Sequence, residues 1–324
     1  MNRTLLTVLL LAGVWAGVVT SRAYSQTFPS KPVRIIVGYP AGGESDIIVR
    51  RFGQVFQGTI GQPVIVDNRP SAAGILGSVL NAQAAPDGHT ITYVASPTQT
   101  INPHLQKNLG FNPLADYTPI TILVRTPLVL LSNRSLPVGN VAELLAFARA
   151  NPGKLTFGSG GMGSGNHLAG ELFKKHANID VLHVPYKGGG QATVMDVING
   201  TLSFMFGVVP NSIPFIRNGQ LNPLAVSSRT RSAALPNVPT VIETGIPNFD
   251  VSIWFGFEGP PKLPKPIVDV LSAAIRRAAS DPVFSRPLLE AGYDVAPSSP
   301  EEMEAKIKSD YDLWGPLVKE AKIE

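Results

Sequence analysis

The sequence predicts an α/β protein whose sheets are mostly parallel and are covered by helices. Short runs of β-branched residues alternate with segments that repeat apolar residues at helical spacing. Glycine-rich turns follow several of the strand-like runs, and proline–glycine stops end several of the helical ones. The 324 residues include no cysteine, so packing and not disulfide bonds must stabilise the fold.

The clearest strand–turn–helix pattern stands near the start. The strand-like run 33–37 (VRIIV) precedes the glycines Gly42 and Gly43, and a helix is expected to begin near Ser45 and to stop at Gly58. A helix start leaves backbone N–H groups without intrahelical partners and carries the positive end of the helix dipole. This turn is therefore expected to bind an anion.

Further elements follow in alternation. We expect strands at 64–66, 90–95, 154–157, 181–184, 202–206 and 224–227. We expect helices at 74–85, 141–150, 166–177, 191–199, 264–280 and 300–321. Asn140, with Glu143 three residues later, resembles a capping box at the start of one of these helices.

The N-terminal segment is typical of a secretory signal peptide. Arg3 supplies a positive charge, the stretch 5–19 is apolar and uncharged, and small residues allow cleavage after Ser25. A membrane anchor is the weaker interpretation, because a span needs about 20 apolar residues. We therefore expect residues 1–25 to be removed and the protein to be periplasmic.

Charge and residue usage exclude several functions. The formal net charge is +4, and loss of Arg3 and Arg22 with the signal peptide lowers it to +2. Basic residues are scattered, which argues against a nucleic-acid surface. Thiolate catalysis is impossible without cysteine, and neither a metal site nor a cofactor is indicated by the histidine spacing.

Glycine and hydroxyl residues gather at the expected carboxyl ends of strands. Besides Gly42 and Gly43, these turns are 158–165 (GSGGMGSG), 188–190 (GGG) and 96–98 (SPT). In open α/β sheets, ligands bind outside the carboxyl ends of the strands. Several such turns together would surround a small anion with N–H and O–H donors.

One of these turns also fits a dinucleotide fingerprint. Gly158, Gly160 and Gly163 match G-x-G-x-x-G, which requires an acidic residue at the end of the next strand. The only candidate, Asp180, precedes that strand. The sequence also lacks a P-loop, so nucleotide binding is not expected.

Seven segments in a fixed order resemble the Bug-type periplasmic receptors of tripartite tricarboxylate transporters. They are 29–50, 66–74, 84–91, 157–173, 184–206, 234–247 and 254–260, and they span nearly the whole chain after the signal peptide. The resemblance implies a two-domain periplasmic-binding-protein (Venus-flytrap) architecture that closes around a small carboxylate. It also implies delivery of that ligand to membrane transporter subunits.

In that family two loops, one from each domain, hold the ligand. They match 39–46 and 159–167 here. The residues that we expect to contact the ligand are Tyr39, Ala41, Gly42, Gly43, Ser96, Thr98, Ser159, Gly160, Ser164, Gly165, Asn166, His167 and Lys187. We expect no catalytic residue.

Some side chains have two open interpretations. Asp46 is expected to cap the helix or fix the loop, because a carboxylate would repel a bound anion. Tyr39 either lines the cleft or packs at the end of its strand. His167 either donates to the ligand or caps its helix, and Lys187 faces either the ligand or solvent. Glu44 adds negative charge if it points inward and stabilises the helix start if it points outward. 

The resemblance implies two domains, and the chain is expected to pass twice between them. We expect a first domain from 26–126 and 250–324 and a second from 127–249, with two crossings that form a hinge. Gly207 stands where relatives often carry an aspartate, so a contact from that position is absent. We expect a monomer.

The alternatives to a transport receptor are a periplasmic hydrolase and a sensor subunit. A periplasmic hydrolase would need a nucleophile–base–orienter set or a metal cluster, and the sequence shows neither G-x-S-x-G nor metal-ligand spacing. A sensor subunit that presents its loaded form to a signalling protein would use the same pocket, and the sequence does not separate it from a transport receptor.

Overall fold

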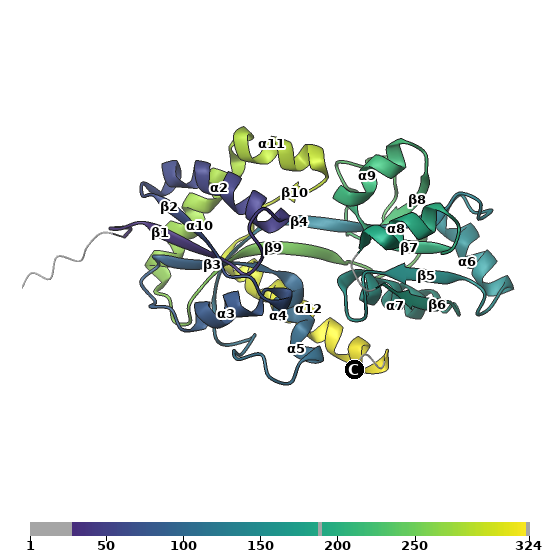
Figure 1. Ribbon diagram of the computed structural model, residues 1–324, viewed down its shortest axis with the longest axis horizontal. Helices are drawn as coiled ribbons and strands as arrows, with labels where there is room; N and C mark the ends of the chain where they lie inside the picture. The colour runs from purple at the N-terminus through teal and green to yellow at the C-terminus, as the bar shows by residue number, and fades with distance from the viewer. Residues whose placement is uncertain (1–27, 187–189, 322–324) are drawn as a thin grey trace, which may run out of the picture.

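The computed structural model describes residues 28–186 and 190–321. The expected signal peptide (1–25) and Lys187 lie outside these residues. The chain forms two α/β domains side by side along the long axis (Figure 1). The first contains β1, β2 and β3, and the second contains β5, β6 and β7.

The first domain is built on a parallel core. β1 (Val33–Val37) pairs in parallel with β2 (Val64–Asn68) and with β3 (Thr90–Ala95). The long strands β9 (Ser252–Gly259) and β4 (Thr118–Asn133) continue the sheet, and both contacts, β3 with β9 and β9 with β4, are antiparallel.

The second half of β4 belongs to the second domain. There it pairs antiparallel with β7 (Phe204–Val208) and β8 (Leu221–Val226). β5 (Thr156–Ser159) pairs in parallel with β6 (Leu182–Pro185) and β7. The two-residue strand β10 (Asp294–Val295) pairs with the first half of β4.

Helices cover both sheets. They are α2 (Glu44–Ile60), α3 (Ile75–Ala82), α4 (Ser96–Thr100), α5 (Asn102–Leu105), α6 (Val141–Ala150), α7 (Gly165–Ala177), α8 (Gly190–Ile198), α9 (Val209–Arg217), α10 (Lys265–Ser280), α11 (Pro282–Ala291) and α12 (Pro300–Glu320), with 3₁₀ turns η1 (Ala72–Gly74) and η2 (Ile242–Thr244). None of the helices that the structure describes is both long and apolar enough to cross a bilayer.

The α/β class and the two-domain architecture are confirmed, but the sheet is mixed and not mostly parallel. The strands expected at 33–37 and 90–95 have those bounds, whereas α2 continues past Gly58 to its left-handed C-cap at Gly61. β4 and β9 were not predicted, and their antiparallel pairing changes the character of the sheet. Residues 96–98 open α4 where only a turn was expected.

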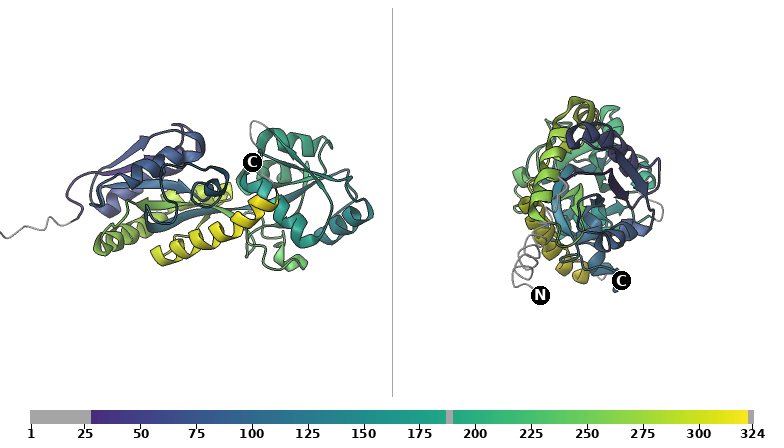
Figure 2. Two further views of the ribbon diagram at one scale, coloured as in Figure 1. Left: turned by 90° about the horizontal axis from the view of Figure 1, so that it is seen from below. Right: turned by 90° about the vertical axis from the view of Figure 1, so that its left-hand side faces the viewer.

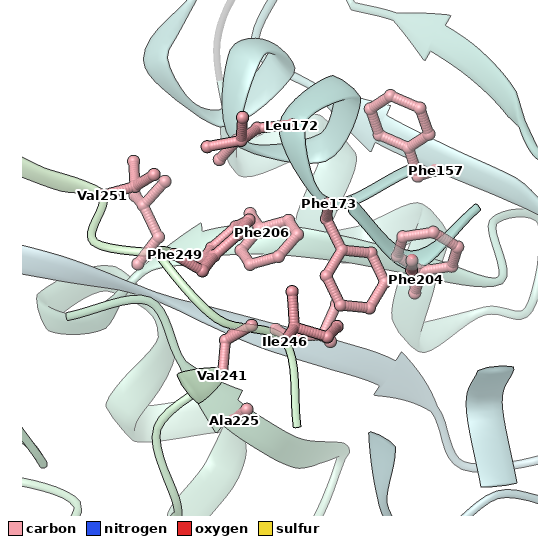
Figure 3. Close-up of a cluster of buried hydrophobic side chains, with 14 of the residues drawn as sticks. Phe157, Leu172, Phe173, Phe204, Phe206, Ala225, Val241, Ile246, Phe249 and Val251 are labelled. Atoms are coloured by element: carbon pink, nitrogen blue, oxygen red, sulfur yellow. The ribbon is translucent and has the colours of Figure 1, made fainter. Parts of the chain in front are cut away.

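Each domain has its own apolar core. Val37, Phe52 and Phe257 belong to the core of the first domain, between its sheet and helices α2, α10 and α11. In the second domain, Phe173 of α7 lies beside Phe206 of β7 (Figure 3), with ring centroids 5.6 Å apart. Burial on this scale favours folding by about 25 cal/mol per Å² of apolar surface.

Three elements connect the domains. β4 and β9 cross between them, and α12 runs along both (Figure 2). Met303 of α12 packs with Trp254 of the first domain, whereas Trp314 and Leu317 near its C-terminal end pack in the core of the second. The sequence predicts two crossings, and the third connection is made by the apolar C-terminal turns of α12.

Candidate functional site

Strand direction places the candidate loops. β4 runs from the first domain into the second, and the pairings make β1 and β3 run in the same direction. β5, β6 and β7 run the opposite way, because β7 is antiparallel to β4. The carboxyl ends of both sets of strands therefore point toward the other domain, which is where α/β sheets bind ligands.

The loop after β1 is held by side chains from its own domain. The Asn68 side-chain amide donates to the Tyr39 carbonyl (3.2 Å), and the Arg50 guanidinium donates to Oδ1 of Asn68 (2.8 Å). Arg50 also binds the carboxylate of Asp46 (Nε–Oδ2 2.9 Å). These braces were not predicted, because Asn68 stands far from the loop in the chain.

Asp46 stabilises the loop, as its expected role requires. It is buried and accepts a hydrogen bond from the Gly42 amide (2.8 Å). Burial raises the pKa of the Asp46 carboxyl, but the hydrogen bonds from Arg50 and Gly42 outweigh it, so the pKa lies below its ordinary value. The Gly42 amide is therefore occupied, and Gly43 N–H donates to the Pro40 carbonyl (3.2 Å).

Glu44, the first residue of α2, is turned to its own domain. Its carboxylate accepts a hydrogen bond from the hydroxyl of Tyr293, which lies between α11 and β10. Burial raises the pKa of this carboxyl. The contact with Tyr293 was not visible in the sequence, because 249 positions separate the two residues.

The loop after β5 is closed on itself. The Ser164 hydroxyl caps α7 by accepting from the His167 amide (3.4 Å) and donates to the Gly161 carbonyl (2.6 Å). Nδ1 of His167 accepts from the Gly163 amide (3.0 Å). Ser164 and His167 were expected to donate to a ligand, but here they hold the loop in shape.

A second histidine, His183 of β6, completes this network. Its ring stacks on that of His167, with centroids 3.7 Å apart, and its Nε2 lies 2.7 Å from Oγ of Ser159. Burial lowers the pKa of His167 to about 4 and that of His183 to about 3. Both rings are therefore neutral near pH 7, and the buried Ser159 hydroxyl is not free to contact a ligand.

The hydroxyls of α4 are also occupied. Thr98 donates to the Ala73 carbonyl (2.6 Å), and its Oγ1 lies 3.4 Å from the Tyr39 hydroxyl. Ser96 accepts from the Trp254 amide of β9 (3.2 Å). Thr98 therefore connects α4 to the β1 loop, and Ser96 connects it to β9. Their predicted role as ligand donors stays a prediction.

The β5 loop touches the first domain directly. Gly163 has φ +73°, and a Cβ there would lie 2.5 Å from Cδ1 of Leu105 in α5. A Cβ at Gly165 would lie 3.6 Å from Cδ1 of Ile253 in β9, which is an ordinary contact. Leu105 and Ile253 were not singled out in the sequence, and they place this loop against the first domain and a crossing strand.

Backbone donors remain at both helix starts. Within the described part of the chain, the amides of Glu44 and Ser45 in α2 and of Gly165 and Asn166 in α7 have no acceptor. The N-cap of α2, Gly43, offers no side chain to cap it. These amides, with the dipoles of two helices, can bind an anion.

The other predicted positions differ in exposure. Ala41 and Gly42 are exposed, while Gly160 and Asn166 are half-buried and accessible. Gly207 of β7 has no space for a side chain, because a Cβ there would lie 2.5 Å from Oγ of Ser212. No cluster of three or more potential metal ligands occurs among residues 28–186 and 190–321.

Known proteins of one family match this sequence over nearly the whole length of the chain. Residues 48–323 match the family described as the tripartite tricarboxylate transporter family receptor, TctC. A protein of the tcbD–tcbE intergenic region of Pseudomonas sp. (strain P51) is 34% identical over 97% of this chain and 94% of its own length. BugT of Bordetella pertussis is 30% identical over 99% of this chain and 98% of its own length.

Solved structures give the same result. A TctC solute-binding protein from Polaromonas, without ligand, matches with a TM-score of 0.82 and 28% identity over 91% of this chain and all of its own. An R. palustris protein with adipate matches with a TM-score of 0.73 and 29% identity over 91% of this chain and 99% of its own. MatC of Rhodopseudomonas palustris, with bound malate, matches with a TM-score of 0.69 and 27% identity over 90% of this chain and all of its own. The chain therefore belongs to the TctC family of tripartite tricarboxylate transporter receptors, which are periplasmic solute-binding proteins.

Proposed function

We propose that this protein binds a small organic carboxylate between its two domains and delivers it to the membrane subunits of a tripartite tricarboxylate-type transporter. The observation that carries the proposal is the opposed direction of the two strand sets, which turns the starts of α2 and α7 toward the other domain. Relatives with adipate and with malate support a carboxylate as the ligand.

The donors left in the two loops are sufficient for the affinity that a receptor needs. A dissociation constant near 1 μM corresponds to about 8 kcal/mol. Charge-assisted hydrogen bonds contribute about 1.5–3 kcal/mol each. The amides of Glu44, Ser45, Gly165 and Asn166, with the Asn166 side chain, reach this range. We propose these groups as the ligand donors, with Tyr39, Ala41 and Gly160 at the rim and Lys187 as a further candidate.

We also propose that the two domains close around the ligand. We propose a first domain from 26–126 and 250–324, a second from 127–249, and closure around β4 and β9. The C-terminal turns of α12 are the exception to this division: Trp314 and Leu317 belong to the core of the second domain, so these turns move with it. Bending during closure therefore includes α12 between Ile307 and Trp314.

We also propose that the protein is secreted to the periplasm and acts there as a monomer. A signal peptide cleaved after Ser25 would bring the chain to the periplasm, where its relatives work. A sensor subunit with the same pocket is the alternative, and binding to a purified transporter complex in the presence of ligand separates the two.

A panel of small acids tests the binding function. We expect adipate, malate or a related di- or monocarboxylate to raise the melting temperature of the mature protein, since a ligand that binds only the folded state stabilises it. The amide of each acid is the matched control, because it keeps the shape and loses the charge. A panel in which no acid exceeds its amide would refute carboxylate binding.

A further inference from the structure

A polar cavity lies beside β4 and β9, the strands that cross between the domains. It has a volume of about 440 Å³, within the range of small-molecule sites. Its walls come from β4, the segment after β8, the start of β9, β10 and α12, so both domains contribute. The charged residues that line it are Arg125, Arg229, Arg231, Lys306, Asp250 and Asp294. No residue of the loops 39–46 and 159–167 is among its lining residues.

Cations exceed carboxylates in this lining, and most already have partners. Arg231 binds Glu243 (Nε–Oε2 3.0 Å), and Lys306 binds Asp310 (Nζ–Oδ1 2.9 Å). Arg229 lies 3.8 Å from Asp250 in a loose and exposed pair. These pairs leave Arg125 as the lining cation whose charge is not matched by a close carboxylate.

Arg125 stands at the centre of the crossing. In β4 it lies opposite Trp254 of β9 on one side and Asp294 of β10 on the other. Its Nε is buried and has no hydrogen-bond acceptor within the described residues. Burial raises the pKa of the Asp294 carboxyl, against the smaller opposing effect of the Arg125 charge, but the two residues form no ion pair within 4 Å. Arg125 also lines the cavity, so its guanidinium is the group there that an oxyanion entering the cavity would bind.

We propose that this cavity is a second binding site, for a small oxyanion with a phosphate or carboxylate head group, and that Arg125 anchors it. A planar guanidinium binds such head groups through two parallel hydrogen bonds. Arg229 also lines the cavity, from the second domain, and its loose and exposed pair with Asp250 leaves it able to turn to a bound anion.

The position of the site gives it a consequence for the whole receptor. Because both domains line it, an anion bound there connects them behind the crossing strands. Its affinity therefore depends on the angle between the domains, and binding of the two ligands is coupled reciprocally. The existence of this site does not depend on the proposed receptor function.

Titration of the mature protein with inorganic phosphate and, separately, with succinate tests the proposal. Ionic strength is held constant with sodium chloride, and binding is followed by melting temperature and calorimetry. We expect phosphate, succinate or both to bind the wild type, and Arg125→Met to weaken that binding at least about tenfold, the equivalent of about 1.5 kcal/mol. Arg276→Met, which removes an exposed arginine of α10, is the matched control and should change nothing.

A loop variant separates this site from the one between the domains. Gly165→Pro removes a proposed carboxylate donor of α7. Anion binding that persists in the Gly165→Pro variant but not in Arg125→Met supports the site at Arg125. If Arg125→Met fails to fold, Arg229→Gln replaces it and should weaken binding about threefold or more. The proposal is overturned if neither anion binds the wild type beyond chloride, or if Gly165→Pro abolishes binding while the arginine variants keep it.

Discussion

At the scale of single residues, Glu258 of β9 is a buried carboxyl whose pKa is strongly raised. It is fully buried, and burial raises the pKa of its carboxyl to about 8, although the side-chain amide of Gln99 donates to it. The folded protein therefore keeps this proton at pH values where the unfolded chain has lost it. The contribution of Glu258 to the free energy of unfolding therefore falls as pH rises from about 4.5 to about 8.

Glu258→Gln should remove this pH dependence. The amide keeps the volume of the side chain and its hydrogen bond to Gln99 and carries no ionisable proton. We expect the difference in unfolding free energy between variant and wild type to grow in favour of the variant from pH 5 to pH 8, by about 1.4 kcal/mol per pH unit at most. Urea unfolding at several pH values measures it, and a difference that is independent of pH would contradict the assignment.

His167 should produce the opposite dependence. Its folded pKa of about 4 lies below the unfolded value of about 6.5, so its contribution to stability is complete above pH 6.5 and is lost as pH falls toward 4. In His167→Gln this loss should be smaller than in the wild type. The exposed His176→Gln is the control, and equal acid sensitivity in all three proteins would refute the prediction.

The same scale shows where sequence reasoning about the site stops. Residue types pointed to the turns 42–43 and 158–165, and the resemblance to known receptors gave the loops 39–46 and 159–167. Both loops stand at helix starts that face the other domain. The hydroxyls of Ser159 and Thr98 were expected to face a ligand, yet each has a partner distant in the chain, His183 and Ala73. A hydroxyl binds whichever partner the fold brings near it, and the neighbouring residues in the sequence do not predict that partner.

At the scale of elements, helices with capping signals and short β-branched strands followed from local patterns. β3 at 90–95 and α6 at 141–150 have the predicted bounds. β4 and β9 did not follow, because both are buried on two faces over most of their length and show no alternation of polar and apolar residues. Their antiparallel direction depends on contacts between distant segments.

The start of α7 offers a test at this scale. Ser164→Ala removes the cap of the helix and the hydrogen bond to the Gly161 carbonyl, and should lower the free energy of unfolding by about 0.5–2 kcal/mol. Ser164→Thr keeps the hydroxyl and should recover most of that loss. Urea unfolding compares the two, and equal stability of the alanine variant and wild type would show that the cap contributes nothing.

At the scale of the whole molecule, the fold turns two helix starts toward the space between the domains and leaves their first amides free. β4, β9 and α12 connect the domains, so small rotations around them change the distance between the two starts. The resemblance to known receptors predicted the architecture, whereas the third link appeared only when the contacts of Trp314 were known.

The affinity of a bound carboxylate in a pair of Gly165 variants tests the central claim most directly. Proline is favoured at the first position of a helix and has no N–H, so Gly165→Pro deletes one donor and keeps α7, while Gly165→Ala keeps the donor and has space beside Ile253. For the acid that binds best in the panel, calorimetry should give near wild-type affinity for the alanine variant and at least about tenfold weaker binding for the proline variant. Equal affinity of the two folded variants would contradict the account, because it would show that the free amide of α7 does not hold the ligand.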